Sequence, residues 1–96
     1  MSAYLIVRVN VTDMEQYSEY MKLTPAILEK YGGKFVVRGG EKVTLEGPEV
    51  TDRMVVVKFE SVQATKTFYY SEEYQAAIKV RENAADASFV VVEGLE

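Results

Sequence analysis

Four short runs of apolar and β-branched residues stand out along the chain, and each has the length of a strand. They cover Tyr4–Val11, Lys34–Arg38, Arg53–Phe59 and Ser88–Glu93. Runs of this length that are bounded by Gly, Pro, Asp or Ser are typical of strands. We therefore predict four strands at these positions.

Two glycine pairs bracket the second strand in the stretch YGGKFVVRGG. Gly32 is placed to end the preceding helix in a left-handed conformation, which glycine adopts without strain. Gly39 and Gly40 predict a bulge, after which the strand resumes as Glu41–Glu46. A Gly-Pro turn follows, so the second and third strands are expected to form a hairpin.

Between the first two strands, apolar residues recur at the spacing of a helix, at Met14, Tyr17, Met21 and Leu28. Thr12, with Glu15 three residues later, fits a capping box that begins this helix. Thr24 followed by Pro25 resembles a fresh N-cap, so we expect a kink or a restart there. Between the third and fourth strands, Ser61 and Ser71 are each predicted to cap a further helical segment.

This order of elements, β-α-β-β-α-β, predicts an α+β fold of the ferredoxin-like type in a single domain, residues 1–96. Right-handed crossovers then give a four-stranded antiparallel sheet with helices on one face. The runs Met54–Val57 and Phe89–Val92 do not alternate apolar with polar residues, which indicates cover on both faces of the sheet. A second copy is the simplest cover for the face without helices, so we expect a homodimer.

The amino-acid composition limits which catalytic and metal-binding sites the protein can contain. The 96 residues include no Cys and no His, and the formal net charge is −4. Disulfides, thiolate or imidazole metal sites and His-dependent catalysis are therefore excluded, and we expect neither a metal nor a cofactor. No basic run suggests nucleic acid, and no apolar run has the length of a membrane span or a signal peptide. A cytoplasmic location is the expectation.

Arginines on apolar strands are the first candidates for a binding site. Simple alternation would place Phe35 and Val37 on one face of the second strand and Arg38 on the other. Arg38 and Arg8 are each a charged residue on an otherwise apolar face of their strand. A charge on a covered face needs a partner or a ligand, and Glu46 is one candidate at a strand end.

A cleft between sheet and helices would place further polar groups near these arginines. Arg38 and Arg81 could clamp a small carboxylate or enolate, with Tyr69, Ser71, Tyr74, Arg8 and Glu46 as the other candidate ligand-binding residues. The alternative is structural: the arginines pair with Glu46 or Glu93 and fasten the dimer, the tyrosines pack in the core, and the serines cap helices.

The chain resembles the bacterial domain-of-unknown-function family thirteen-thirty, within the dimeric α/β-barrel superfamily. The resemblance rests on YGGKFVVRGG, LEG at 45–47, the strand that begins at Arg53, FES at 59–61, FYYSEEYQAAIKVRENAA at 68–85 and VEG at 92–94. Glu60 and Phe68 depart from the Pro and Trp common there. The resemblance implies a ferredoxin-like protomer and a barrel-forming dimer, but no reaction.

Three functions remain open from the sequence. The first is a small protein that binds an acidic or phenolic molecule in the cleft. The second is a cofactor-independent monooxygenase or isomerase, an analogy with some members of the superfamily. The third is a non-catalytic structural or interaction dimer. The sequence does not decide whether the protein is an enzyme.

Overall fold

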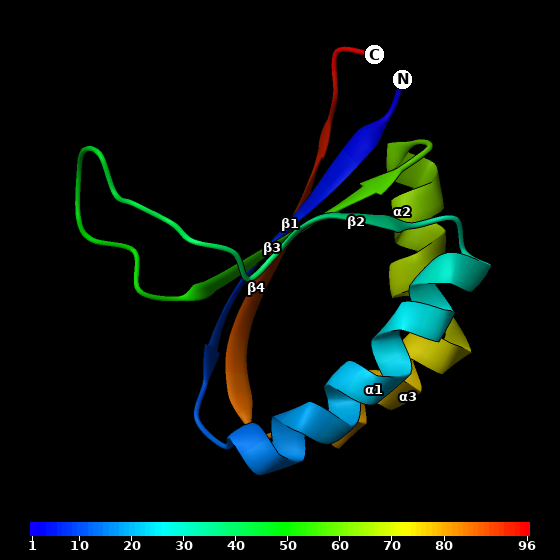
Figure 1. Ribbon diagram of the computed structural model, residues 1–96. Helices are drawn as coiled ribbons and strands as arrows, with labels where there is room; N and C mark the ends of the chain where they lie inside the picture. Colours follow the sequence, from blue (N-terminus) through cyan, green and yellow to red (C-terminus); the bar gives the residue numbers. More distant parts are fainter.

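The computed structural model describes residues 1–96 as one layer of sheet and one layer of helices (Figure 1). The elements follow in the order β1 (Ala3–Val11), α1 (Met14–Lys30), β2 (Lys34–Arg38), β3 (Arg53–Phe59), α2 (Val62–Tyr69), α3 (Glu72–Val80) and β4 (Ala85–Glu93). The second predicted helical region is split into α2 and α3, as the two serine caps indicated.

The four strands form one antiparallel sheet in the order β2-β3-β1-β4. All three helices lie on the same side of this sheet, which confirms the ferredoxin-like prediction (Figure 1). Side chains from β1 alternate as the sheet requires: Leu5, Val7 and Val9 are buried toward the helices, whereas Arg8 and Asn10 are exposed on the other side. We call the side without helices the outer face.

The bulge in β2 lies three to four residues earlier than the glycines suggested. Phe35 pairs with Val57, but Val37 pairs with Val56, so the register shifts at Val36. One extra residue reverses the alternation from that point. Arg38 therefore pairs with Val55 and shares the helix-covered face with Phe35, contrary to the simple alternation expected from sequence.

Helix α1 begins and continues differently from the prediction. Asp13 is the N-cap, and its carboxylate accepts a hydrogen bond from the Gln16 amide at 3.1 Å, where Thr12 had been expected to cap. The helix also runs through Pro25 without a restart. Proline removes the amide that would bond to the Met21 carbonyl, and the Thr24 hydroxyl lies 3.5 Å from that oxygen instead.

The caps of the later helices are confirmed. The Ser61 hydroxyl accepts from the Ala64 amide at 3.0 Å, and the Ser71 hydroxyl accepts from the Tyr74 amide at 3.1 Å. Gly32, just beyond α1, has a φ of 82°. The two serine caps and the helix-ending glycine could be predicted from the sequence because each depends on residues within one helical turn.

Two strand boundaries differ from the prediction. Residues 41–46 form no strand and belong to a long loop between β2 and β3. In this chain they have no neighbouring strand to pair with, and an alternating pattern alone does not make a ladder. The last strand starts at Ala85, three residues before the predicted Ser88, because it pairs with β1 as far as Val11.

Candidate functional site

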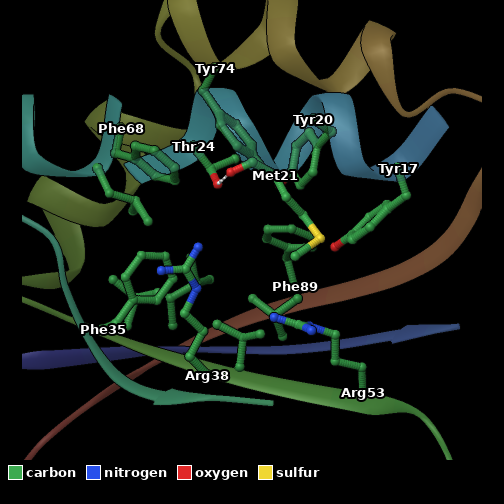
Figure 2. A pocket seen from close by; sticks show the side chains of 15 residues that line it. Tyr17, Tyr20, Met21, Thr24, Phe35, Arg38, Arg53, Phe68, Tyr74 and Phe89 are labelled. Carbon is green, nitrogen blue, oxygen red and sulfur yellow. Dashed lines mark hydrogen bonds between the residues drawn. The ribbon is translucent and has the colours of Figure 1, made fainter. Parts of the chain in front are cut away.

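A pocket opens between the sheet and the helices, with a cavity volume of about 50 Å³. Figure 2 shows its two sides: Arg38 and Arg53 extend from the sheet, while Tyr17, Tyr20 and Tyr74 extend from the helices. Twelve of its fifteen lining residues are hydrophobic. We call it the Arg–Tyr pocket. Its apolar walls and few convergent polar groups are typical of small-molecule sites.

Arg38 reaches the pocket because of the β2 bulge. Its guanidinium lies over the Phe35 ring, with the central carbon 4.4 Å from the ring centroid. Stacking on an aromatic face fixes the plane of the guanidinium and leaves its N–H edge free to bind an anion.

Arg53, the first residue of β3, lies across the hairpin from the end of β2. Its guanidinium packs on Gly39, where an added Cβ would come within 3.1 Å of the guanidinium carbon. Gly39 has a φ of 67°, and its amide donates to the Met54 carbonyl at 2.9 Å. Glycine therefore serves two purposes here, because it adopts the left-handed conformation and leaves room for Arg53.

The helix side of the pocket is neutral and polar. The hydroxyls of Tyr20 and Tyr74 share a hydrogen bond of 2.5 Å, and both side chains are buried. Burial raises the pKa of both hydroxyls above the ordinary value of 10.0, so both stay protonated near neutral pH. Two hydroxyls that share one hydrogen bond keep one further hydrogen to donate.

Arg81 lies behind this tyrosine pair, at the end of α3. Its guanidinium carbon is 5.2 Å from the centroid of the Tyr20 ring and 5.3 Å from that of Phe89. The Nε atom is buried and has no hydrogen-bond partner. Arg81 therefore adds positive charge next to the hydroxyls without lining the pocket.

None of these three arginines has a carboxylate partner. The ion pairs of the chain are Arg8–Asp52, Lys22–Glu19 and Lys30–Glu73. Within one chain Arg38 forms no ion pair with Glu46 or Glu93. The structural alternative, in which the arginines pair with these carboxylates and fasten the dimer, stays a prediction. Two guanidinium groups without a carboxylate partner, those of Arg38 and Arg53, thus line an apolar pocket, and that of Arg81 lies behind the tyrosine pair, in a protein of net charge −4.

The other candidates from the sequence lie apart from the Arg–Tyr pocket. Arg8 is on the outer face, 3.4 Å from Asp52, and Glu46 is exposed in the β2–β3 loop. Ser71 serves as a helix cap. Tyr69 lines a separate cavity of about 130 Å³ beside α2 and β4.

Sequence reasoning left four pocket residues with polar groups out of the candidate set: Arg53, Tyr17, Tyr20 and Thr24. A signal for the last three was present in the sequence. Tyr17, Tyr20 and Thr24 are three and four residues apart, which places them on one face of α1. Arg53 could be found only through the hairpin pairing that sets it beside Gly39.

No three His, Cys, Asp or Glu side chains come together as potential metal ligands. None of the helices is both long and apolar enough to cross a membrane.

Solved structures share this fold. RPA0582, a protein of unknown function from Rhodopseudomonas palustris, superimposes with a TM-score of 0.78 at 23% identity, covering 99% of this chain and 83% of that one. A dimeric ferredoxin-like protein of unknown function from Jannaschia sp. CCS1 gives 0.71 at 12% identity, covering 98% and 100%. SnoaB, a cofactor-independent oxygenase from Streptomyces nogalater, gives 0.69 at 9% identity, covering 99% and 94%.

Identities this low show a common fold and no common activity. A comparison with functionally curated proteins finds no match. The family described as a domain of unknown function (DUF1330) matches residues 2–95, which is nearly the whole chain. The resemblance seen in the sequence motifs is therefore confirmed, and the protein belongs to the DUF1330 family.

Proposed function

We propose that the protein binds a small acidic or phenolic molecule in the Arg–Tyr pocket. The observation that carries this proposal is the pair of guanidiniums, Arg38 and Arg53, that line an apolar cavity without carboxylate partners, with Arg81 behind the tyrosines. Arg53 and Arg81 are half-buried, and positive charge held partly out of water without a counter-ion is costly, so a bound anion reduces that cost. Arg38 is exposed and free to bind the same anion.

The arrangement suggests an orientation for the ligand. Its anionic group would lie between Arg38 and Arg53, because guanidiniums bind carboxylates and enolates through charge-assisted hydrogen bonds. Its apolar body would pack on Phe35 and Phe89. The hydrogen left over from the Tyr20–Tyr74 pair would donate to a second oxygen of the ligand.

Binding of simple probes tests this proposal. We would titrate isotope-labelled protein with benzoate, 4-hydroxybenzoate and the uncharged benzyl alcohol, and follow amide chemical shifts. We expect shifts centred on pocket residues and at least about tenfold weaker binding of the alcohol, the effect of losing charged hydrogen bonds.

Arg38→Gln should weaken benzoate binding by about tenfold or more, since it removes one such bond. Lys79→Gln removes the same charge from an exposed position on α3 and should leave binding unchanged. Equal effects of the two substitutions, or no shifts in the pocket with any probe, would contradict the proposal.

A cofactor-independent monooxygenase or isomerase is the second candidate. Its support is the fold shared with SnoaB, together with a protonated tyrosine pair beside unpaired arginines. The test is oxygen uptake, or isomer formation, by the protein with a panel of hydroquinones and enolisable phenols. Turnover that Tyr20→Phe abolishes would favour an enzyme, and binding without turnover would favour the first proposal.

We also infer that the functional unit is a homodimer packed through the outer face. Val90 and Val92 are 57% and 48% exposed there, next to Ile6 and Val56. Apolar side chains that cover a sheet face are characteristic of an interface. Proteins of this fold from Jannaschia and from Bacteroides fragilis are described as dimers. A monomer in light scattering at micromolar concentration would refute this inference.

A non-catalytic interaction dimer is the third candidate from the sequence. The apolar outer face is the observation that favours it. Its test is the same probe titration: a dimer that binds no probe in the pocket fits this candidate alone.

A further inference from the structure

A second cavity, of about 130 Å³, lies between α2 and β4 on the helix-covered face of the sheet. We call it the edge cavity, because β4 is an edge strand. Five of its seven lining residues are hydrophobic. The hydroxyl of Thr65, one of the other two, already donates to the Ser61 carbonyl at 3.0 Å, and Lys66 is exposed, so its ammonium stays in water. The edge cavity therefore suits an apolar group.

The edge cavity and the Arg–Tyr pocket share a wall. Leu5 and Phe89 line both spaces. Tyr74 lines only the Arg–Tyr pocket and Tyr69 lines only the edge cavity. The ring centroid of Phe89 is 6.2 Å from that of Tyr74 and 5.7 Å from that of Tyr69. A single layer of aromatic rings thus separates the two spaces.

Strand pairing gives the Arg–Tyr pocket a floor that leads from its anion-binding end to this wall. Arg38 pairs with Val55, Val55 pairs with Val7, and Val7 pairs with Phe89. These four residues form one row across the sheet, and all four line the pocket. Three strand spacings of roughly 4.8 Å separate the ends of the row by about 14 Å. The floor between the arginine and the wall is entirely apolar.

Phe89 is the wall residue that can move with the least loss. The Tyr74 hydroxyl is bonded to that of Tyr20, and Leu5 is only 4% exposed in the central strand β1. Phe89 has no polar group, is half-buried, and lies on an edge strand. A change of its χ1 rotamer would join the two spaces without breaking a hydrogen bond. It would give up the contact with Arg81, whose guanidinium carbon lies 5.3 Å from the ring centroid.

We propose that the Arg–Tyr pocket and the edge cavity are two halves of one site for an amphipathic acid, with Phe89 as the gate between them. The proposal rests on the anion site proposed above. The acidic head of the ligand binds between Arg38 and Arg53, and its apolar tail passes Phe89 into the edge cavity. The ligand class is therefore an acid or phenol that carries an unbranched apolar chain.

The size and the lining of the edge cavity support this assignment. An apolar cavity of about 150 Å³ is large enough to take up a benzene ring. Each methylene that leaves water strengthens binding by about fourfold, so a short tail contributes strongly to affinity. The chain holds no other buried polar side-chain atom without a partner than Nε of Arg81, so nothing in the edge cavity opposes an apolar tail.

Benzoates with para-alkyl groups test the proposal, because they keep one head and vary the tail. We would titrate isotope-labelled protein with benzoate, 4-ethylbenzoate, 4-butylbenzoate and the branched 4-tert-butylbenzoate, and follow amide chemical shifts. We expect the Kd to fall by up to about fourfold for each added methylene of the straight chain. The butyl compound should also shift the amides of Thr65 and Val91, which benzoate leaves in place. The branched isomer should gain less, since the passage beside one ring is narrow.

A substitution at Val91 tests where the tail lies. Val91 lines the edge cavity and not the Arg–Tyr pocket. Val91→Phe fills part of the edge cavity and should remove most of the gain in affinity from benzoate to 4-butylbenzoate. Leu23→Phe adds the same ring on the exposed side of α1 and should keep that gain. If Val91→Phe does not fold, the location of the wild-type shifts decides the question.

The possible failures differ from one another. If benzoate binds in the Arg–Tyr pocket and the alkyl series brings no gain, the single site is overturned and the anion site stands. Equal gains for the two butyl isomers, or shifts that never reach Thr65 and Val91, would place the tail elsewhere and also overturn it. If neither benzoate nor any alkylbenzoate shifts a pocket amide, both proposals are overturned.

Discussion

At the scale of single residues, the Tyr20–Tyr74 pair is the buried polar element of the pocket. Each hydroxyl satisfies the other at 2.5 Å, while the rings pack edge to face with centroids 6.2 Å apart. A buried hydroxyl that loses its partner costs more than the hydrogen bond was worth, because the remaining group stays desolvated.

We therefore expect Tyr20→Phe and Tyr74→Phe each to lower the free energy of unfolding by about 1–3 kcal/mol. The double variant should lose less than the sum, because it leaves no unsatisfied hydroxyl. Urea unfolding of the four proteins gives the double-mutant cycle. Additive losses would show that the two hydroxyls do not depend on each other.

Glu73 predicts a dependence of stability on pH. The hydrogen bond from Lys30 lowers its pKa from 4.5 to about 2, and the Tyr31 hydroxyl also donates to it, at 2.9 Å. A carboxyl with a lowered pKa in the folded state stabilises the fold above its unfolded pKa, and this contribution disappears as pH falls through the folded pKa.

The melting temperature of the wild type should therefore exceed that of Glu73→Gln at neutral pH. The difference should shrink between about pH 4.5 and about pH 2. The group is exposed, so the difference will be small. A difference that stays constant over this range would show that the carboxylate charge is not its source.

At the scale of elements, caps and the β2 bulge decide where side chains point. Helix α3 begins with Ser71 as its cap and Glu72 and Glu73 in the first turn, where negative charge is favourable. Its start positions Tyr74 toward the pocket. The bulge at Val36 acts likewise on Arg38, since one extra residue moves that side chain to the other face of the sheet.

Ser71→Ala should lower the free energy of unfolding by about 1 kcal/mol, the usual cost of losing an N-cap. Ser18→Ala is the matched control, because Ser18 lies inside α1 and its hydroxyl bonds only to the Glu15 carbonyl of the preceding turn. Thermal unfolding followed by circular dichroism compares the two. Equal losses would mean that the Ser71 hydroxyl does not act as a cap.

At the scale of the whole molecule, the unequal cover of the two sheet faces is the main feature. The chain measures 33 × 31 × 16 Å, a flat two-layer body with every helix on one side. The core lies between sheet and helices and includes Leu5, Val57, Phe59 and Phe68. The outer face is left with half-exposed apolar side chains.

Ile6→Glu should convert the proposed homodimer into a monomer, because a carboxylate at the centre of an apolar interface would be desolvated without a partner. Size-exclusion chromatography with light scattering measures the mass. Glu60→Gln, at an exposed position outside the strands, is the control and should remain dimeric. An Ile6→Glu dimer of unchanged affinity would place the contact elsewhere.

Short-range patterns were enough to predict the four strands, the three helices, the two serine caps and the hairpin of β2 with β3. Arg38 and Tyr74 were also recognised as candidates. Arg53 and Tyr20 were not, because an arginine at a strand start and a tyrosine at helical spacing look the same whether they face solvent, core or pocket. The sequence pattern did not show that Asp13 rather than Thr12 caps α1, or that α1 continues through Pro25. Both features involve side-chain hydrogen bonds that the pattern alone cannot choose between.

By itself, the sequence determined the kinds of elements, their order and the chemistry that is absent, since propensity, capping and composition act locally. Only the tertiary structure decided which arginines converge. The position of the bulge in β2 determines on which face of the sheet the side chains after it lie. The pairing of β2 with β3 brings Arg53 against Gly39. Both depend on contacts between residues far apart in the chain, whose strength comes from packing across the sheet.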